Sequence, residues 1–331
     1  MLNTLRLATY ASLITLGGFA SSASAADLKV VASFSIIADF ARNVGGDLVE
    51  ISTLVGPDGD AHVYEPRPAD AAALEGADVV LVNGLQFEGF MSRLIEASGT
   101  KASVVEVSKG IEPLKTAEEE HHHEDEADAD AEHDRAGGEK AEAGHDHGHE
   151  GHHHGEFDPH AWQSIHNAEI YVKNIADAFC EADKAGCATY RANSEAYVAK
   201  LGELEAEVKA AIEAVPADKR TVITSHDAFG YFEHEYGLNF IAPEGISTEA
   251  EASAADVAKL IDQVKHDKAS AIFLENITNP RLIEQISTET GIKIGGTLYS
   301  DALSKSDGPA ATYIDMFRYN VNTMKAAILG S

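Results

Sequence analysis

Basic residues, cysteines and long apolar runs are all scarce in this sequence. Its 25 lysines and arginines oppose 55 aspartates and glutamates, so the formal net charge is -30 at pH 7. This excess of negative charge argues against nucleic acid and anionic membrane surfaces as partners, whereas cations fit it. Beyond the N-terminal region, no apolar run approaches the length of a membrane span. We therefore expect a freely soluble mature protein.

Residues 1–26 have the pattern of a secretory signal peptide. Arg6 precedes an apolar run from Leu7 to Ala20, and small residues fill positions 21–26, where cleavage is expected. The alternative is an N-terminal membrane anchor, but the glycines and serines leave the apolar stretch too short to span a bilayer. No cysteine follows the run, so a lipid anchor is not expected. The pattern predicts a protein released into the periplasm.

The two cysteines of the chain are Cys180 and Cys187, which lie close together in the sequence. A secreted protein meets an oxidising compartment, so a short-loop disulfide between them is predicted. Such a bridge would join a helical corner and take no part in chemistry.

Short apolar runs alternate with helical stretches in both halves of the chain, and 331 residues are enough for two cores. The expected strands are 28–34, 49–55, 78–82 and 103–107 in the first half, and 221–225, 238–241, 270–274 and 293–298 in the second. This alternation predicts an α/β fold of two lobes, each a mostly parallel sheet flanked by helices. In such sheets, ligands bind at the carboxyl ends of the strands.

A long helix is expected between the two halves. Large apolar residues recur there at steps of three and four, namely Tyr190, Tyr197, Leu201, Leu204, Val208, Ala211 and Val215. From 188 to 214 this helix would be roughly 40 Å long, enough to brace both lobes rigidly. We expect an N-terminal lobe at 27–163, linking helices at 164–216 and a C-terminal lobe at 217–331.

Residues 117–156 interrupt this pattern with fifteen acidic residues and no aromatic residue, and are expected to be a disordered loop. They hold ten of the sixteen histidines: His121, His122, His123, His133, His145, His147, His149, His152, His153 and His154. Imidazole that is neutral near pH 7 binds transition metals, and softness alone leaves zinc, copper and nickel open. The run is internal, irregular and mixed with acids, unlike an expression tag. Many interchangeable weak sites suit metal collection better than selection.

A selective metal site needs a few ligands held by rigid neighbours. His62 follows a predicted strand and a turn rich in glycine, His226 follows the strand at 221–225, and His160 lies where the loop rejoins the fold. Asp301 ends the last strand region. Three imidazoles and one carboxylate could close a tetrahedral zinc site, although spacing alone is weak support for it.

The remaining histidines outside the loop have ordinary structural explanations. His234 and His266 are flanked by charged residues as on solvated helix faces, and His166 lies beside Asn167 at a helix start. We expect none of the three to bind metal.

The sequence resembles periplasmic metal-binding proteins that serve zinc and manganese importers of the ATP-binding-cassette class, in particular the ZnuA-type zinc proteins. The matching stretches are Gly59-Asp60-Ala61-His62-Val63-Tyr64-Glu65-Pro66-Arg67-Pro68-Ala69-Asp70, Asp78-Val79-Val80-Leu81-Val82-Asn83-Gly84, Asp158-Pro159-His160-Ala161-Trp162, Thr224-Ser225-His226-Asp227-Ala228-Phe229-Gly230-Tyr231-Phe232 and Leu298-Tyr299-Ser300-Asp301. They span nearly the whole mature chain and are specific in combination.

The resemblance implies that His62, His160 and His226 are metal ligands and that Asp301 occupies the fourth position. Histidine at the third position is similar to the zinc branch, because manganese-type relatives place a carboxylate there and manganese prefers oxygen ligands. Some zinc members with a loop complete the site with water or with a residue beside the first histidine. Here that neighbour is Ala61, with Asp60 one position further away.

The expected function is capture of a zinc ion and its delivery to an importer in the inner membrane, with the loop as an auxiliary collector. A periplasmic zinc donor protein is a further candidate partner, and we expect the chain to act as a monomer. One alternative is a zinc storage protein in which the loop is the functional part. Another is uptake of manganese or copper.

A zinc hydrolase is the alternative from the class of enzymes. Such an enzyme needs three ligands, an activated water and a general base. The sequence contains no His-Glu-x-x-His, Gly-x-Ser-x-Gly or Cys-x-x-Cys motif, and Glu275 is the strand-end carboxylate we consider as a base. Because a fourth protein ligand would close the open position, we expect no enzymatic activity.

Overall fold

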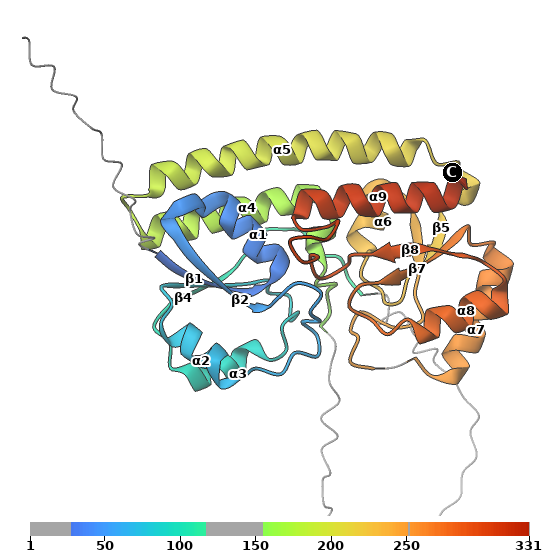
Figure 1. Ribbon diagram of the computed structural model, residues 1–331, viewed down its shortest axis with the longest axis horizontal. Helices are drawn as coiled ribbons and strands as arrows, with labels where there is room; N and C mark the ends of the chain where they lie inside the picture. The colour runs from blue at the N-terminus through green and yellow to red at the C-terminus, as the bar shows by residue number, and fades with distance from the viewer. Residues whose placement is uncertain (1–27, 117–154, 251, 331) are drawn as a thin grey trace, which may run out of the picture.

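Two four-stranded parallel sheets lie side by side in the computed structural model, which describes residues 28–116, 155–250 and 252–330 (Figure 1). The first sheet has the order β2-β1-β3-β4, with β1 at Leu28–Phe34, β2 at Val49–Val55, β3 at Val79–Val82 and β4 at Ser103–Glu106. The second has the order β6-β5-β7-β8, with β5 at Thr221–Ile223, β6 at Asn239–Ile241, β7 at Ala271–Glu275 and β8 at Ile294–Leu298. The two lobes therefore repeat one topology.

The central strands are almost continuously apolar because parallel strands covered by helices are buried on both faces. In β1, the backbone of Ala32 pairs with Thr53 of β2 on one side and with Leu81 of β3 on the other. The strand order reverses beside β1 in the first sheet and beside β5 in the second. Loops that follow the central strands therefore converge in the region where ligands bind in such folds.

Helices cover both sheets. The first lobe contains α1 at Ser35–Gly45, α2 at Pro68–Glu75, α3 at Met91–Ser98 and the short helix η1 at Gly46–Leu48. The second contains η4 at Ala217–Lys219, α6 at Gly230–Tyr236, α7 at Ala254–Asp267, α8 at Arg281–Thr290 and the C-terminal α9 at Tyr313–Leu329. In the region described, no helix is long and apolar enough to cross a membrane.

The lobes are connected by η3 at Ala161–Gln163, α4 at Ile165–Ala182 and α5 at Cys187–Glu213. The Ser164 hydroxyl accepts the Asn167 N–H at the start of α4, an N-terminal cap. With 27 residues, α5 is roughly 40 Å long and extends over both lobes (Figure 1). A disulfide joins Cys180 to Cys187 at the corner between α4 and α5, as the sequence predicted.

One hydrophobic core extends through both lobes and beneath the linking helices. Aromatic rings fill it where the lobes meet: Phe34 lies 4.9 Å from Trp162, and Phe40 lies 4.7 Å from Tyr313, measured between ring centroids. A smaller core lies between the second sheet and α7 and α8. The shared core makes the lobes parts of one packed body.

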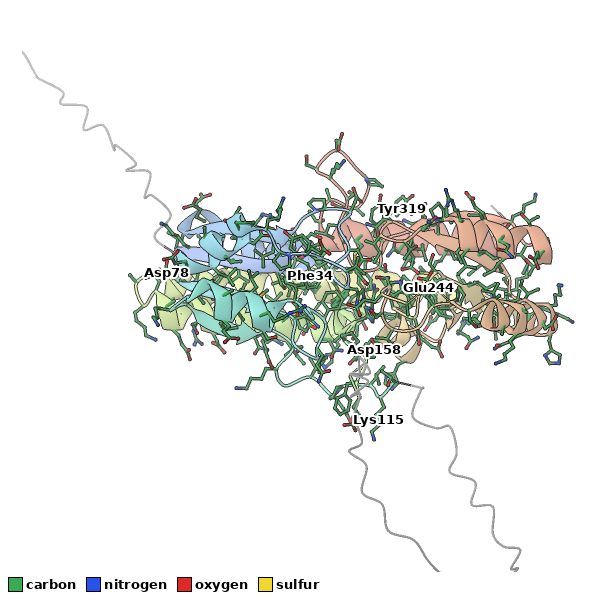
Figure 2. The ribbon with its side chains drawn as sticks, turned by 90° about the horizontal axis from the view of Figure 1, so that it is seen from below. Phe34, Asp78, Lys115, Asp158, Glu244 and Tyr319 are labelled. Atoms are coloured by element: carbon green, nitrogen blue, oxygen red, sulfur yellow. A yellow bond between two sulfur atoms is a disulfide. The ribbon has the colours of Figure 1, made fainter. Side chains whose placement is uncertain are left out.

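The predicted fold class is confirmed, and each expected strand begins and ends within two residues of an observed one. The two ends of the predicted loop meet, because the Thr116 N–H donates to the Glu156 carbonyl at 3.2 Å, close to Lys115, which projects from the body in Figure 2. Residues 1–26 and the ten loop histidines lie outside the described residues. The lobe boundaries at 163 and 216 stay predictions.

Candidate metal centre

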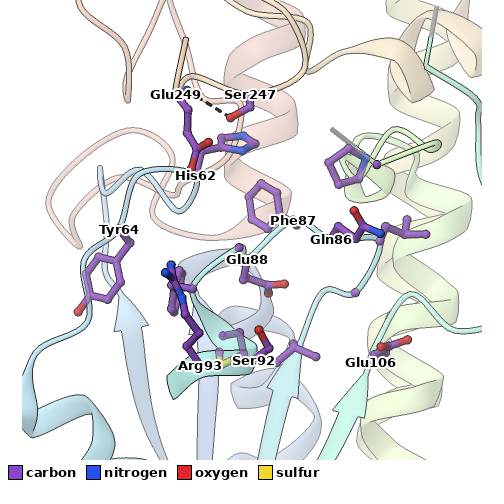
Figure 3. Close-up of a pocket in the computed structure, with 18 of the residues that line it drawn as sticks. His62, Tyr64, Gln86, Phe87, Glu88, Ser92, Arg93, Glu106, Ser247 and Glu249 are labelled. Carbon is purple, nitrogen blue, oxygen red and sulfur yellow. Dashed lines mark hydrogen bonds between the residues drawn. The ribbon is translucent and has the colours of Figure 1, made fainter. Parts of the chain in front are cut away.

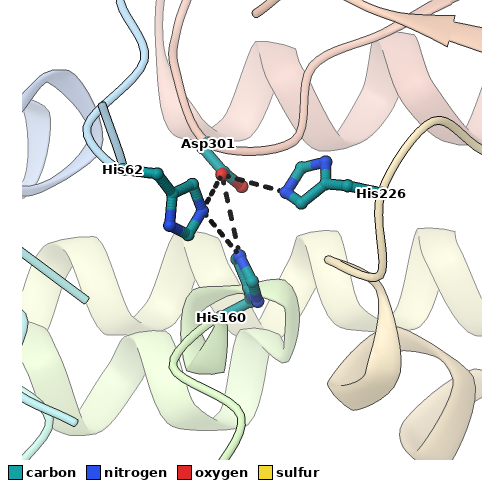
Figure 4. A group of neighbouring side chains, drawn as sticks. All are labelled: His62, His160, His226 and Asp301. Carbon is teal, nitrogen blue, oxygen red and sulfur yellow. Dashed lines mark hydrogen bonds and ion pairs between the residues drawn. The ribbon is translucent and has the colours of Figure 1, made fainter. Parts of the chain in front are cut away.

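Four buried side chains meet between the lobes: His62, His160, His226 and Asp301 (Figure 4). One potential ligand atom from each lies within 4.8 Å of all the others. Elsewhere in the described residues, histidine, cysteine and carboxylate side chains form no comparable group.

Each of these residues follows a strand or begins a linking element. His62 lies in the loop after β2 and His160 immediately precedes η3, so both come from the first part of the chain. His226 follows β5 and Asp301 follows β8 in the second lobe. The group therefore spans the junction between the lobes at the carboxyl ends of parallel strands, where the sequence predicted a site.

Four of the six separations between the potential ligand atoms are close to those around a tetrahedral metal ion. Oδ2 of Asp301 lies 3.1 Å from His62 Nε2, 3.2 Å from His226 Nε2 and 3.6 Å from His160 Nε2. The Nε2 atoms of His62 and His160 are 3.4 Å apart. Bonds of about 2.0–2.2 Å around a tetrahedral zinc ion imply ligand separations of about 3.3–3.6 Å. Small shifts would therefore suffice to coordinate such an ion.

Carboxylates hold two of the histidines from behind. Asp158 Oδ1 lies 2.8 Å from Nδ1 of His160, and Glu275 Oε2 lies 2.6 Å from Nδ1 of His226. Such partners keep the proton on Nδ1 and direct the unprotonated Nε2 toward a metal. The arrangement is typical of histidines that coordinate metal ions.

The backbone beside Asp301 is fixed by the linking helices. The Ser300 carbonyl accepts hydrogen bonds from Trp162 Nε1 at 2.9 Å and from Gln163 Nε2 at 2.8 Å. Asp301 itself is fully buried, and its Oδ1 atom has no hydrogen-bond partner among the described residues. A buried carboxylate oxygen without a partner is costly, and a bound cation would remove that cost.

The negative side chains of the site hold protons on two histidines. Burial alone would lower the pKa of His160, but Asp301 and Asp158 outweigh it and raise this pKa to about 9. Burial is likewise outweighed at His226, where Glu275 and Asp301 raise the pKa well above its usual range. A divalent cation would replace these protons with its own charge.

The pKa values of the other two side chains are lowered. Burial lowers the pKa of His62 more than Asp301 raises it. Burial would raise the pKa of Asp301, but His160 and His226 hold it well below its usual range. The lowered pKa values favour an anionic Asp301 and a neutral His62 in the absence of metal.

His62 also faces a cavity of about 1040 Å³ in the first lobe, which is lined by α3 and by Ser247 and Glu249 of the second lobe (Figure 3). The His62 residue is 9% exposed, whereas the other three residues are fully buried. His62 is therefore the ligand candidate nearest to solvent.

Asp60, considered as a neighbour of the first histidine, does not join the group. Its Oδ1 accepts the His62 backbone N–H at 2.9 Å, and its Oδ2 accepts the Thr248 hydroxyl at 2.6 Å. The three histidines excluded by sequence, His166, His234 and His266, are exposed.

Glu275, considered as a general base, lies behind His226. Its Oε1 accepts the backbone N–H groups of Ser225 and His226 at 2.7 and 2.9 Å. Asp158 is a supporting residue that sequence reasoning missed, although its position two residues before His160 suits a turn that brings the two side chains together.

The family was identified by comparison with known proteins. Residues 30–327 match the family described as zinc-uptake complex component A, periplasmic. The chain belongs to this family. The binding component of a zinc-uptake system is a solute-binding protein, so the expectation that the chain is not an enzyme is confirmed.

Relatives in the zinc-uptake component A family differ in the metal that their names give. The chain is 31% identical to the iron-binding protein YfeA of Yersinia pestis, over 96% of this chain and 93% of that protein. It is 31% identical to the manganese-binding lipoprotein MntA of Halalkalibacterium halodurans, over 91% of this chain and 88% of that protein. The fold is also similar to the structure of the periplasmic zinc-binding protein TroA from Treponema pallidum, with a TM-score of 0.77 and 28% sequence identity. The match covers 91% of this chain and 99% of that one. Membership thus establishes a periplasmic component for uptake of a divalent metal.

Proposed function

We propose that the chain binds one zinc ion through His62, His160, His226 and Asp301 and delivers it to an importer of the ATP-binding-cassette class in the inner membrane. The observation that carries this proposal is a buried group of three imidazoles and one carboxylate whose potential ligand atoms all lie within 4.8 Å of one another. Four protein ligands leave no open position for an activated water, which favours capture over catalysis. An N-terminal signal peptide at 1–26, which is part of the proposal, would deliver the chain to the periplasm.

The donor atoms favour zinc over the metals in the names of several relatives. Nitrogen ligands bind Zn²⁺ more tightly than Fe²⁺ or Mn²⁺, and manganese prefers oxygen. Cu²⁺ binds nitrogen tightly too, but it prefers a tetragonal arrangement to a tetrahedral one. Competition of Mn²⁺, Fe²⁺ and Cu²⁺ against bound zinc tests this choice, and displacement of zinc by equimolar manganese would contradict it.

The histidines of residues 117–156 would collect further ions weakly and raise their concentration near the central site. The alternative is a storage protein in which this segment provides the useful capacity. The two functions differ in what remains when the segment is deleted, because a transport protein keeps one tight site and a storage protein loses most of its capacity.

Calorimetric zinc titration tests the proposal directly. The mature protein and a version without residues 117–156 are each titrated with and without His62→Ala, His160→Ala and His226→Ala, and the exposed His234→Ala serves as the matched control. One tight site that survives the deletion, collapses in the first three variants and persists in the control is the expected result. Tight binding that disappears with the segment and ignores the three substitutions would favour storage.

A further inference from the structure

The loop that carries His62, residues 56–62, belongs to the first lobe but is held by the second. The Asp58 N–H donates to the Leu303 carbonyl at 2.9 Å. The Thr248 hydroxyl donates to Oδ2 of Asp60 at 2.6 Å. Both partners of the loop lie in the C-terminal part of the chain, so the position of the loop depends on how the lobes meet.

Asp60 transmits this contact to His62. While Oδ2 accepts the Thr248 hydroxyl, Oδ1 accepts the backbone N–H of His62 at 2.9 Å. Thr248 follows a segment whose Glu244 forms a parallel backbone bridge with His226. The chain segment 244–248 and the hydrogen bonds at its two ends therefore connect His226 to the backbone of His62.

His62 is also the ligand candidate that can leave the site most readily. His160 and His226 lie beside Asp158 and Glu275. Among the described residues, no carboxylate lies behind the His62 ring, which packs against Phe87 with ring centroids 4.8 Å apart. The cavity adjoins His62 alone of the four residues. Movement of the loop would open the site on this side.

We propose that Asp60 and Thr248 form a latch that keeps His62 on the metal and sets the rate at which the metal leaves. This proposal rests on the function proposed above, because it takes His62 as a metal ligand. Asp60 and Thr248 are positioning residues, since neither contributes an atom to the ligand group. The two sides of the latch belong to different lobes, so a separation of the lobes during docking to the importer would break it and free His62.

Stopped-flow release of zinc into excess chelator tests the latch in the mature protein. Thr248→Val removes the hydroxyl and Thr248→Ser retains it. Ser247→Ala is the matched control, because the adjacent Ser247 hydroxyl accepts the Glu249 N–H at 3.2 Å and takes no part in the contact with Asp60. We expect release to be about tenfold faster in Thr248→Val, as for a lost hydrogen bond to a charged group, and nearly unchanged in the other two. Zinc association and the melting temperature of the metal-free protein should stay near wild type.

A double-mutant cycle separates the latch from unrelated effects. Asp60→Ala should release zinc faster than Thr248→Val, and the double variant should be no faster than Asp60→Ala, because both act through one hydrogen-bonded chain. Equal release by Thr248→Val and wild type, or additive effects in the cycle, would overturn the latch. Weak binding by the wild-type protein, or full binding by His62→Ala, would instead overturn the proposed function.

Discussion

Nδ1 of His226 lies 2.6 Å from Oε2 of Glu275, and both side chains are fully buried. Two backbone N–H groups hold the other oxygen, Oε1, so the carboxylate cannot turn away. A histidine that binds metal through Nε2 must keep its proton on Nδ1, and the negative charge of the Glu275 carboxylate beside Nδ1 favours a proton there. If His226 binds metal as proposed, Glu275 would orient its ring before any ion arrives.

Glu275→Gln should weaken zinc binding by about 10-fold to 100-fold, the usual effect of removing such a partner. Glutamine can face His226 with its oxygen only by turning its amide NH₂ toward two backbone N–H groups. Calorimetric titration measures the loss, with the exposed Glu284→Gln on α8 as the control. If Glu275→Gln folds normally and binds zinc as tightly as the control, Glu275 does not orient the ligand.

Zinc affinity should fall continuously as the pH is lowered from about 9. The raised pKa values of His160 and His226 mean that both rings carry an extra proton near neutral pH, and a metal must displace these protons. His62 has a lowered pKa and releases none. Binding near pH 7 should thus release about two protons.

The number of protons released is measured from the dependence of the binding enthalpy on the ionisation enthalpy of the buffer. Zinc affinity that is the same at about pH 7.5 and about pH 5.5, within the range where histidine titrates, would contradict the prediction. So would binding near pH 7 without proton release.

The sequence was sufficient for the fold because the strands are short apolar runs with helices between them, a pattern that parallel packing requires. The four strands of each sheet were predicted nearly to the residue, and β1 and β2 at their observed bounds. The apolar residues at steps of three and four also predicted the buried face of α5 correctly, since Tyr190, Tyr197 and Leu201 are all buried.

The candidate site was predicted only in part from the residues themselves. Strand-end positions singled out His62, His226 and Asp301, but a strand end does not determine which side chains point at one another. The resemblance to a family supplied that step.

The supporting contacts could not be predicted from periodicity. Asp60 meets Thr248 from 188 positions away, and Glu275 meets the backbone of His226 from 49 positions away. Such pairs depend on how two lobes pack, and no local pattern encodes them.

The disulfide should affect stability and leave metal binding unchanged. Replacing Cys180 and Cys187 together by serine removes a cross-link over a sequence separation of 7, which costs about 2 kcal/mol of unfolding free energy in the chain-entropy estimate. The bridge lies at the α4–α5 corner, apart from the four ligand candidates. Chemical denaturation should show the loss, while zinc titration should match wild type. A weaker zinc site in the folded double variant would show that the corner helps to position the ligands.

Trp162 should report metal binding because it is the single tryptophan of the chain and its ring centroid lies 5.3 Å from that of His160. Without metal, His160 is protonated near neutral pH, and a cationic imidazole beside an indole quenches its fluorescence. Zinc displaces that proton, so we expect emission to rise until one equivalent is bound and then to stay constant.

Ions collected elsewhere on the chain would leave the signal unchanged, which separates the central site from weaker ones. His160→Ala should remove the rise, whereas the exposed His166→Ala should retain it. Emission that keeps changing well beyond one equivalent in a version without residues 117–156 would mean that Trp162 senses something other than the proposed centre.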